Sequence, residues 1–289
     1  MGSQSGIWAV GTAAHRHLEF TVEDEARLGP ALARLPEVTG VVVNVHVVVG
    51  VGDRVAQELF GDGAPRVPPV PELEGVPHTP RDLWVWVHGI DRGSVFDVAR
   101  LVTTHLAGVA TPVHALDCFV YHDNRDLMGF VDGSANPSPA EASSGVATIA
   151  TGAAGAGGSF AITQTWVHDL DAFDQLAVED QERVFGRTKP DSIELAGDAK
   201  PVDAHNSRVE IEEDGEELQV FRRSVPYTTG PVAGLHFVGF ARRGDIFPRM
   251  LGRMFGAEDG VRDHMVSFTT PVTGATWFVP TVEQLAGLA

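Results

Sequence analysis

The same order of predicted elements occurs twice along this chain. Residues 84–106 read as a strand, a short glycine-containing turn and a helix, and residues 236–255 repeat that pattern. Two successive units of this kind would form antiparallel sheets, each with helices on one face. The sequence therefore predicts an α+β fold made of two tandem units, with residues 1–145 as the first domain and residues 146–289 as the second.

The first unit is outlined by hydrophobic periodicity and by a proline-rich loop. Apolar residues that alternate indicate strands, whereas apolar residues spaced by three or four indicate helices. Six prolines between residues 63 and 80 indicate a loop. We expect extended segments over residues 6–22, 41–49, 83–87 and 111–121, and helices over residues 23–35 and 94–106.

The second unit follows the same rules. We expect strands over residues 159–166, 235–241 and 275–279, and helices within residues 169–185 and over residues 245–255. A hairpin is predicted to join residues 208–211 to 218–221 around Asp214 and Gly215, because Asp-Gly is typical of two-residue turns. Residues 138–158, rich in alanine, serine and glycine, are expected to form a flexible linker between the units.

The charge and the cysteine content exclude several classes of protein. The 289 residues carry a formal net charge of −18, which is unsuited to tracking nucleic-acid phosphates or to docking on an anionic membrane. The apolar run at residues 41–49 is too short to span a bilayer. The single cysteine, Cys118, rules out an intrachain disulfide, a cysteine-rich zinc site and a four-cysteine iron–sulfur cluster. We expect a cytoplasmic protein without nucleic-acid or membrane partners.

The predicted hairpin has one apolar face that carries polar residues at its ends. In a two-residue turn Ile211 lies opposite Leu218, and extending the alternation places His205, Arg222 and Ser224 on the same face. A guanidinium on a buried face is costly unless an anionic group meets it, and no acidic residue of this hairpin shares the face. A bound anionic group would meet that need, although a structural salt bridge for Arg222 and a hydrogen-bonded core or strand-end position for His205 stay open.

The segment GFVDGSANP at residues 129–137 is the third polar feature. Asp-Gly and Asn-Pro are frequent in turns, so taken alone the segment is consistent with a loop that contains two turns. Its carboxylate, Asp132, becomes a candidate site residue only in combination with the imidazole of His205 and the guanidinium of Arg222.

These segments together resemble a known family. Residues 129–137 resemble the signature of the dye-decolourising peroxidases, and the His205 segment followed by residues 222–227 resembles their B-type branch. Residues 166–171, 182–189, 253–256 and 268–274 agree, so that the resemblance extends over nearly the whole chain. It implies tandem duplicated ferredoxin-like units of the dimeric α+β barrel type, with one haem b per chain in the C-terminal half.

The resemblance also implies roles for individual residues. His205 would be the proximal ligand of the haem iron, with Asp263 behind it as the hydrogen-bond acceptor; Asp259 is the second candidate, and a plain surface carboxylate is an equal alternative. Asp132 and Arg222 would lie on the opposite, distal face, where a carboxylate can move a peroxide proton and an arginine can stabilise developing charge.

Three further residues are candidates for contacts around the haem. Asn136 would either fix the loop that carries Asp132, touch a propionate or cap a turn. Arg187 would pair with a propionate or lie in a solvated turn. Ser224, two residues beyond Arg222, would be a short polar residue on the distal side.

The implied function is that of a haem peroxidase. It would reduce hydrogen peroxide and oxidise dyes or other one-electron donors through a ferryl (compound I) intermediate. The alternatives are a protein that stores or carries haem and has incidental peroxidase activity, and a relative of the same fold without haem. A homo-oligomer, a dimer or larger, is expected from exposed sheet edges and from relatives.

Overall fold

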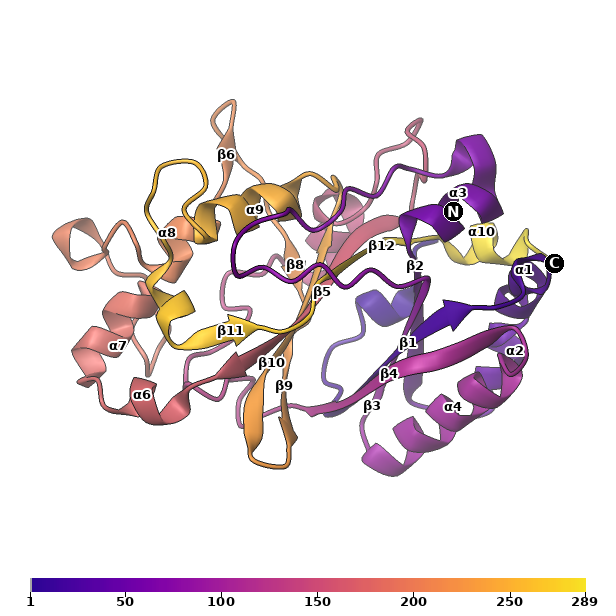
Figure 1. Ribbon diagram of the computed structural model, residues 1–289, viewed down its shortest axis with the longest axis horizontal. Coiled ribbons are helices and arrows are strands. Elements are labelled where there is room, and N and C mark those ends of the chain that lie inside the picture. Colours follow the sequence, from indigo (N-terminus) through magenta and orange to yellow (C-terminus); the bar gives the residue numbers. More distant parts are fainter. Residues whose placement is uncertain (1) are drawn as a thin grey trace.

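The computed structural model describes residues 2–289. The first half of the chain forms four long strands and four α-helices (Figure 1). In chain order they are β1 (Ala14–Val22), α1 (Glu25–Ala33), α2 (Leu35–Thr39), β2 (Val45–Val51), α3 (Asp53–Phe60), β3 (Leu83–Gly89), α4 (Arg92–His105) and β4 (Ala110–Phe119).

The second half begins with short helical segments and continues with strands and helices in alternation. Its elements are α5 (Pro139–Glu141), β5 (Ser159–His168), α6 (Leu170–Asp174), α7 (Val178–Phe185), α8 (His205–Val209), β6 (Glu212–Glu213), β7 (Glu216–Glu217), β8 (Phe221–Arg222), β9 (Val225–Thr229), β10 (Val232–Ala241), α9 (Ile246–Met254), β11 (Thr269–Pro271), β12 (Ala275–Val279) and α10 (Val282–Ala286).

The long strands of both halves form one closed antiparallel barrel. Strands β2, β3, β1 and β4 are neighbours in that order, and β9, β10, β5 and β12 follow them. The two halves meet where Cys118 of β4 pairs with Tyr227 of β9 and where Val51 of β2 pairs with Phe278 of β12. The two sheets expected from the tandem units are joined into one barrel, because the edge strands of each half find partners in the other half, and the barrel implied by the family resemblance is confirmed. The fold is α+β, with a strand barrel.

Strand β3 shows how side chains are divided between the two faces of the barrel. All its residues are buried, and they alternate as expected for a strand. Trp84 and Trp86 belong to the cluster inside the barrel, whereas Val85 and Val87 pack into the cluster under the outer helices. Figure 1 shows α1, α2 and α4 beside the N-terminal strands and α6 to α9 around the C-terminal strands.

The barrel interior also contains buried histidines. The Nε1 atoms of Trp84 and Trp86 lie 3.3 Å and 3.2 Å from the Nδ1 atoms of His17 and His15, and the rings of His17 and His236 lie 4.1 Å apart. Burial lowers the pKa of His15 to about 3, with a contribution from the charge of Arg223. Cζ of Arg223 lies 5.1 Å from the centre of the Trp86 ring, so Arg223 faces the interior.

Residues 138–158 contain more regular and buried structure than the flexible linker that their composition predicts, and only residues 150–154 form a continuous exposed run. A capping box at Ser138 and Glu141 begins α5, a π-helical turn follows over Ala142–Val146, and Ala147 and Ile149 are buried. Small residues pack closely here, since a Cβ on Gly155 would lie 2.8 Å from Phe278. Composition alone cannot separate such a packed segment from a loose one.

The predicted hairpin is correct at its turn and wrong beyond it. Glu212 pairs with Glu217 and Ile211 accepts a hydrogen bond from Leu218, as the two-residue turn requires. The ladder ends there, because residues 205–209 form the helix α8. His205 and Arg222 therefore do not share one face of a hairpin.

Several element bounds also differ from the expectations. Strand β2 begins at Val45 and not at residue 41, β1 begins at Ala14 and not at residue 6, and the helix α3 and the strands β9 and β11 were not anticipated. Cys118 is buried, as expected. None of the helices between residues 2 and 289 has the length and apolar character of a membrane span.

Candidate active site

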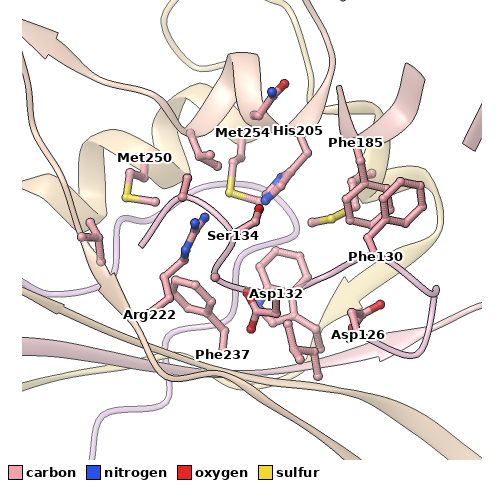
Figure 2. A pocket seen from close by; sticks show the side chains of 18 of the residues that line it. Asp126, Phe130, Asp132, Ser134, Phe185, His205, Arg222, Phe237, Met250 and Met254 are labelled. Carbon is pink, nitrogen blue, oxygen red and sulfur yellow. The ribbon is translucent and has the colours of Figure 1, made fainter. Parts of the chain in front are cut away.

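A deep cavity lies on the outside of the barrel, between β5 and β10 on one side and α8 and α9 on the other (Figure 2). The empty volume of the cavity, including the part at its mouth that is open to solvent, is about 1470 Å³. Outward-facing residues of the two strands line its floor: Ile162, Gln164, Trp166, His168, Leu235 and Phe237. The loop at residues 126–135 supplies a third wall. Of the sequence candidates, Asp132, Arg187, His205 and Arg222 reach the cavity.

His205 stands at the first position of α8 and its imidazole points into the cavity (Figure 2). Its Nδ1 atom lies 2.7 Å from Oδ2 of Asp263, whose carboxylate is fully buried. The other oxygen of Asp263 accepts a hydrogen bond from the backbone of Met265 at 2.9 Å. The carboxylate therefore holds the ring through Nδ1 and leaves Nε2 for a group in the cavity.

Two arginines fix the short helix that carries His205. Arg208 donates to the backbone oxygen of Arg253, and Arg253 donates to the backbone oxygen of Arg208, with distances from 2.9 to 3.1 Å. Arg208 also forms a bidentate pair with Asp259 at 2.8 and 2.9 Å. Asp259 thus braces α8, and Asp263 is the carboxylate that contacts His205.

The loop that carries Asp132 depends on glycine at both of its motif positions. Gly129 and Gly133 have φ angles of +92° and +72°, which favour glycine. A Cβ on Gly129 would lie 2.5 Å from Cε of Lys189, and a Cβ on Gly133 would lie 2.8 Å from Nδ2 of Asn136. Both glycines let other side chains approach the backbone and so set the position of Asp132 between them.

Asp132 and Arg222 face the same cavity from different elements (Figure 2). Burial raises the pKa of Asp132 above its ordinary value, the charge of Arg222 opposes that rise, and the charge of Asp126 adds to it. A carboxylate with a raised pKa accepts a proton more readily than an ordinary one. In Figure 2 His205 enters the cavity from the side opposite to Asp132.

Asn136 joins the Asp132 loop to the strand of Arg222. Its Nδ2 donates to the backbone oxygen of Arg222 at 2.8 Å, and its Oδ1 accepts from the backbone nitrogen of Arg222 at 3.0 Å. The same oxygen lies 3.4 Å from Nε of Arg222. Asn136 thus fixes both the loop and the start of the Arg222 side chain.

The remaining two candidates differ in position. Arg187 lines the cavity, and its guanidinium donates to Ser192 and pairs with Glu194 at 3.3 Å. Ser224 is buried and is not among the described residues that line the cavity; its Oγ accepts from the backbone of Val238 at 3.4 Å. The prediction that Ser224 shares a face with Arg222 is wrong. It assumed one continuous strand, whereas β8 ends at Arg222 and β9 begins only at Val225.

A buried hydrogen-bonded pair beside Asp132, His168 and Asp126, was not predicted from the sequence. Nε2 of His168 lies 2.9 Å from Oδ2 of Asp126, and Nδ1 of His168 lies 2.7 Å from Oγ1 of Thr269. All three residues line the cavity. The available signal was the period of two along β5, which places His168 on the same face as Ile162, Gln164 and Trp166.

The described residues of the cavity do not form a metal site by themselves. Among residues 2–289, no group of three or more histidine, cysteine or carboxylate side chains could hold a metal ion directly. An imidazole backed by a carboxylate is instead the donor set that binds one axial position of a metal already held by a macrocycle. The aromatic and aliphatic walls suit a flat apolar ring system.

Comparisons with known proteins agree with this chemistry. The Dyp-type peroxidase C-terminal family matches residues 123–284. The sequence is 36% identical to the dye-decolorizing peroxidase of Rhodococcus erythropolis over 247 residues, 82% of this chain and 72% of the relative. It is 34% identical to the dye-decolorizing peroxidase of Mycobacterium tuberculosis over 278 residues, 92% of this chain and 82% of the relative.

Solved structures match over almost the entire chain. A putative Dyp-type peroxidase from Shewanella oneidensis superposes with a TM-score of 0.90 at 29% identity, covering 99% of this chain and 98% of the other. A DypB variant of Rhodococcus jostii in complex with haem has a TM-score of 0.89 at 30% identity, covering 96% of each chain.

The chain belongs to the dye-decolorizing peroxidase family. It is therefore a haem-dependent peroxidase, an enzyme that uses hydrogen peroxide and a reducing substrate.

Proposed function

We propose that the cavity between β5, β10, α8 and α9 binds one haem b per chain, with His205 as the proximal ligand and Asp132 and Arg222 on the distal side. The observation that supports this proposal is that one cavity contains both groups of side chains. His205, hydrogen-bonded to Asp263, reaches the same cavity as Asp132 and Arg222. The cavity residues of the barrel belong to the C-terminal half, which supports haem binding by that half.

The proposed ligand role of His205 rests on its hydrogen bond to Asp263. A neutral imidazole whose Nδ1–H donates a hydrogen bond to a carboxylate is a more basic metal ligand at Nε2. The same hydrogen bond fixes the orientation of the ring. Because Asp263 is buried and also accepts from the backbone of Met265, it cannot swing away from the ring without loss of that second hydrogen bond.

The proposed distal roles rest on the electrostatics of Asp132 and Arg222. Haem iron, when bound, supplies the redox chemistry that splits the O–O bond of peroxide. The carboxylate of Asp132 would take the proton from one peroxide oxygen and return it to the other, which leaves as water. The guanidinium of Arg222 would stabilise the negative charge that develops on the leaving oxygen.

The remaining contacts are proposed on the same basis. Asn136 would hold Asp132 and Arg222 at a constant separation, because it binds the backbone of Arg222 from the Asp132 loop. Arg187 would pair with a haem propionate by exchanging its contact with Glu194, whose side chain is 44% exposed.

The fold is proposed to be a duplication of ferredoxin-like units. Each half has two central strands flanked by two outer ones, in the order β4–β1–β3–β2 and the order β12–β5–β10–β9. Relative to chain order both halves read fourth, first, third, second, which is the order expected of ferredoxin-like units. Assembly into dimers or larger oligomers and location in the cytoplasm stay predictions from the sequence.

The experiment that tests the ligand assignment is haem reconstitution of the His205→Ala variant. We expect loss of the native Soret band and of tight haem retention, whereas a variant of the exposed His78, His78→Ala, should keep both. A native haem spectrum in His205→Ala would show that another residue binds the iron.

The experiment that tests the distal assignment is stopped-flow absorbance of the holoprotein mixed with hydrogen peroxide. Asp132→Ala and Arg222→Ala should each slow the reaction by about 100-fold or more, the usual range for loss of a positioned proton-transfer group and of a charge-stabilising donor. Both variants should retain haem. A haem-storage protein with incidental activity, which the comparisons do not favour, would show equally slow reactions before and after substitution.

A further inference from the structure

Lys189 packs against the loop that carries Asp132. It is the last residue of the segment 182–189, and its Cε occupies the space that a Cβ on Gly129 would need, at a separation of 2.5 Å. One guanidinium joins the two backbones, because Nη1 of Arg125 donates to the backbone oxygens of Gly129 at 2.9 Å and of Lys189 at 2.7 Å. The lysine and the loop therefore form one packed unit.

The amine of Lys189 is directed inward. Its Nζ lies 2.6 Å from Oε1 of Gln181, a side chain that is 4% exposed. The same nitrogen lies 5.6 Å and 5.7 Å from the ring centres of Phe130 and Phe173, within the range of cation–π contacts. The other lysine of the chain, Lys200, pairs with two glutamates instead. Lys189 is thus held by an amide oxygen and two ring faces.

Phe130 connects this packing to Asp132. Val131, which stands between them, forms an isolated antiparallel bridge within the loop, and the backbone nitrogen of Asp132 donates to the backbone oxygen of Asn124 at 2.9 Å. The segment is therefore locally extended, so that residues 130 and 132 point to the same side, and both line the cavity. A shift of the Phe130 ring would shift the backbone that directs the carboxylate.

The ring that Lys189 contacts also reaches the opposite wall of the cavity. The rings of Phe130 and Phe185 are stacked, with centres 4.0 Å apart and planes at 13°. Phe185 in turn meets the imidazole of His205 edge-on, with ring centres 6.2 Å apart. Figure 2 shows Phe130 and Phe185 together at one end of the cavity. The stack therefore joins the Asp132 loop to the side from which His205 enters.

The influence of Lys189 on Asp132 is one of position and not of charge. Burial raises the pKa of Asp132, and the charges that modify this rise most belong to Arg222, Asp126 and His205. Lys189 is not one of them. Its contacts reach Asp132 only through Gly129 and Phe130.

We propose that Lys189 is a positioning residue for the peroxide reaction, because it holds Phe130 against Phe185 and thereby fixes the carboxylate of Asp132 on the distal side of the cavity. The proposal rests on the distal role of Asp132 proposed above. A displacement of about 1 Å in a reacting group can slow a reaction about 100-fold. A residue that touches no reactant can therefore set the rate through packing alone.

The first experiment removes the amine and keeps most of the apolar stem. In Lys189→Met we expect stopped-flow absorbance of the holoprotein with hydrogen peroxide to show a reaction that is at least severalfold and up to about 100-fold slower. The Soret band should stay parental, since the hydrogen bond between His205 and Asp263 is untouched. Arg183→Met removes a cation at an exposed position of the same segment and should react at the parental rate. A parental rate in Lys189→Met would overturn the proposal.

The second experiment asks whether the lysine acts through Asp132. In an Asp132→Ala background Lys189→Met should cause little further slowing, because no carboxylate is left to position. Equal slowing in both backgrounds would refute the proposed link. The rate of Lys189→Met should also fall at the same acid pH as that of the parent, since the charges around Asp132 are unchanged, and a displaced acid limit would point to a direct charge effect instead.

The third experiment measures the contact with Phe130 without any reaction. Lys189→Met and Phe130→Leu should each lower the midpoint of urea unfolding, and the double variant should lose less than the sum of the two shifts, because the side chains contact each other. Fully additive shifts would show that Phe130 does not depend on the lysine and would contradict the proposed route.

The two proposals fail in different ways. If Asp132→Ala reacts with peroxide at the parental rate, the distal role of Asp132 is wrong. If Asp132→Ala is slow while Lys189→Met reacts at the parental rate, only the positioning role of Lys189 falls.

Discussion

His168 and Asp126 form a buried hydrogen-bonded pair, with Nε2 of the imidazole 2.9 Å from Oδ2 of the carboxylate. The pair connects strand β5 to the loop that carries Asp132, because the other carboxylate oxygen of Asp126 accepts from the backbone of Met128 at 2.7 Å. The charge of Asp126 also raises the pKa of Asp132. A residue outside the proposed catalytic couple thus influences its protonation.

The first prediction concerns the acid limit of the peroxide reaction. Asp126→Asn removes a negative charge that raises the pKa of Asp132, so the carboxylate form should persist to lower pH. Since the proposed proton acceptor is the carboxylate of Asp132, the rate should fall at a lower pH in the variant than in the parent. Stopped-flow rates over a pH series measure this shift, and Asp174→Asn, at an exposed position, is the control. A shift toward higher pH would contradict the assigned influence of Asp126.

The second prediction concerns retention of the iron. Asp263→Asn replaces the carboxylate that accepts from Nδ1 of His205 with a neutral amide. Loss of such a partner usually lowers metal affinity about 10- to 100-fold, and we expect faster transfer of haem to an apo-acceptor within that range. Asp198→Asn, at an exposed position, should transfer haem at the parental rate. Equal rates for the two variants would remove Asp263 from the proposed proximal pair.

The third prediction separates stability from rate at Asn136. Its side chain makes two hydrogen bonds to the backbone of Arg222, each of which contributes about 0.5–1.5 kcal/mol. Asn136→Ala should therefore lower the free energy of unfolding by about 1–3 kcal/mol and slow the peroxide reaction. Urea titrations and stopped-flow measurements check the two effects.

The same residue allows a double-mutant test. The stability loss of Asn136→Ala should persist in an Arg222→Ala background, because the lost hydrogen bonds are to the backbone. The rate loss should largely disappear there, since no guanidinium is left to position. A rate effect of equal size in both backgrounds would indicate that Asn136 acts on Asp132 alone.

The fourth prediction concerns acid stability of the barrel. Burial lowers the pKa of His15 and His236 to about 3 and that of His17 well below its ordinary value. Because these folded-state pKa values lie below the unfolded value near 6.5, the unfolded chain binds more protons as the pH falls. The free energy of unfolding therefore keeps its full value above about pH 6.5 and decreases as the pH falls from about 6.5 to 3. The decrease is roughly 1 kcal/mol per pH unit for each ring.

The measurement is the free energy of unfolding as a function of pH. His236→Gln should show a shallower loss of stability below pH 6.5 than the parent, whereas His78→Gln, at an exposed position, should follow the parent. A parental slope in His236→Gln would mean that this histidine is already charged in the folded protein.

Much of the fold could be predicted from local pattern. The alternation in β3 (Leu83–Gly89) and the helical spacing in α4 (Arg92–His105) and α9 (Ile246–Met254) reflect a period that is independent of distant partners. The closure of the barrel was not readable in the same way, because each seam depends on one pairing between distant residues, such as Cys118 with Tyr227. The helix α8 was missed since the hairpin alternation was extended through residues 205–209, where no ladder exists.

The candidate site was predictable in its chemistry and less so in its geometry. Asp132, His205 and Arg222 stand in segments whose residues resemble those of a known family, and the structure brings all three to one cavity. Ser224 was expected there and lies elsewhere. The pair of Asp126 and His168 was absent from the expectations, since 42 residues separate its members along the chain.

The sequence by itself determined the α+β class, the order of the principal strands and helices, and the residue types that a peroxide-splitting site requires. Only the tertiary structure decided which strands pair where the two halves meet, that Asp263 and not Asp259 meets His205, and that Asp126 and His168 meet beside Asp132. The physical reason is that periodicity and turn chemistry act within a few residues, whereas side-chain contacts between distant segments arise only when packing brings those segments together.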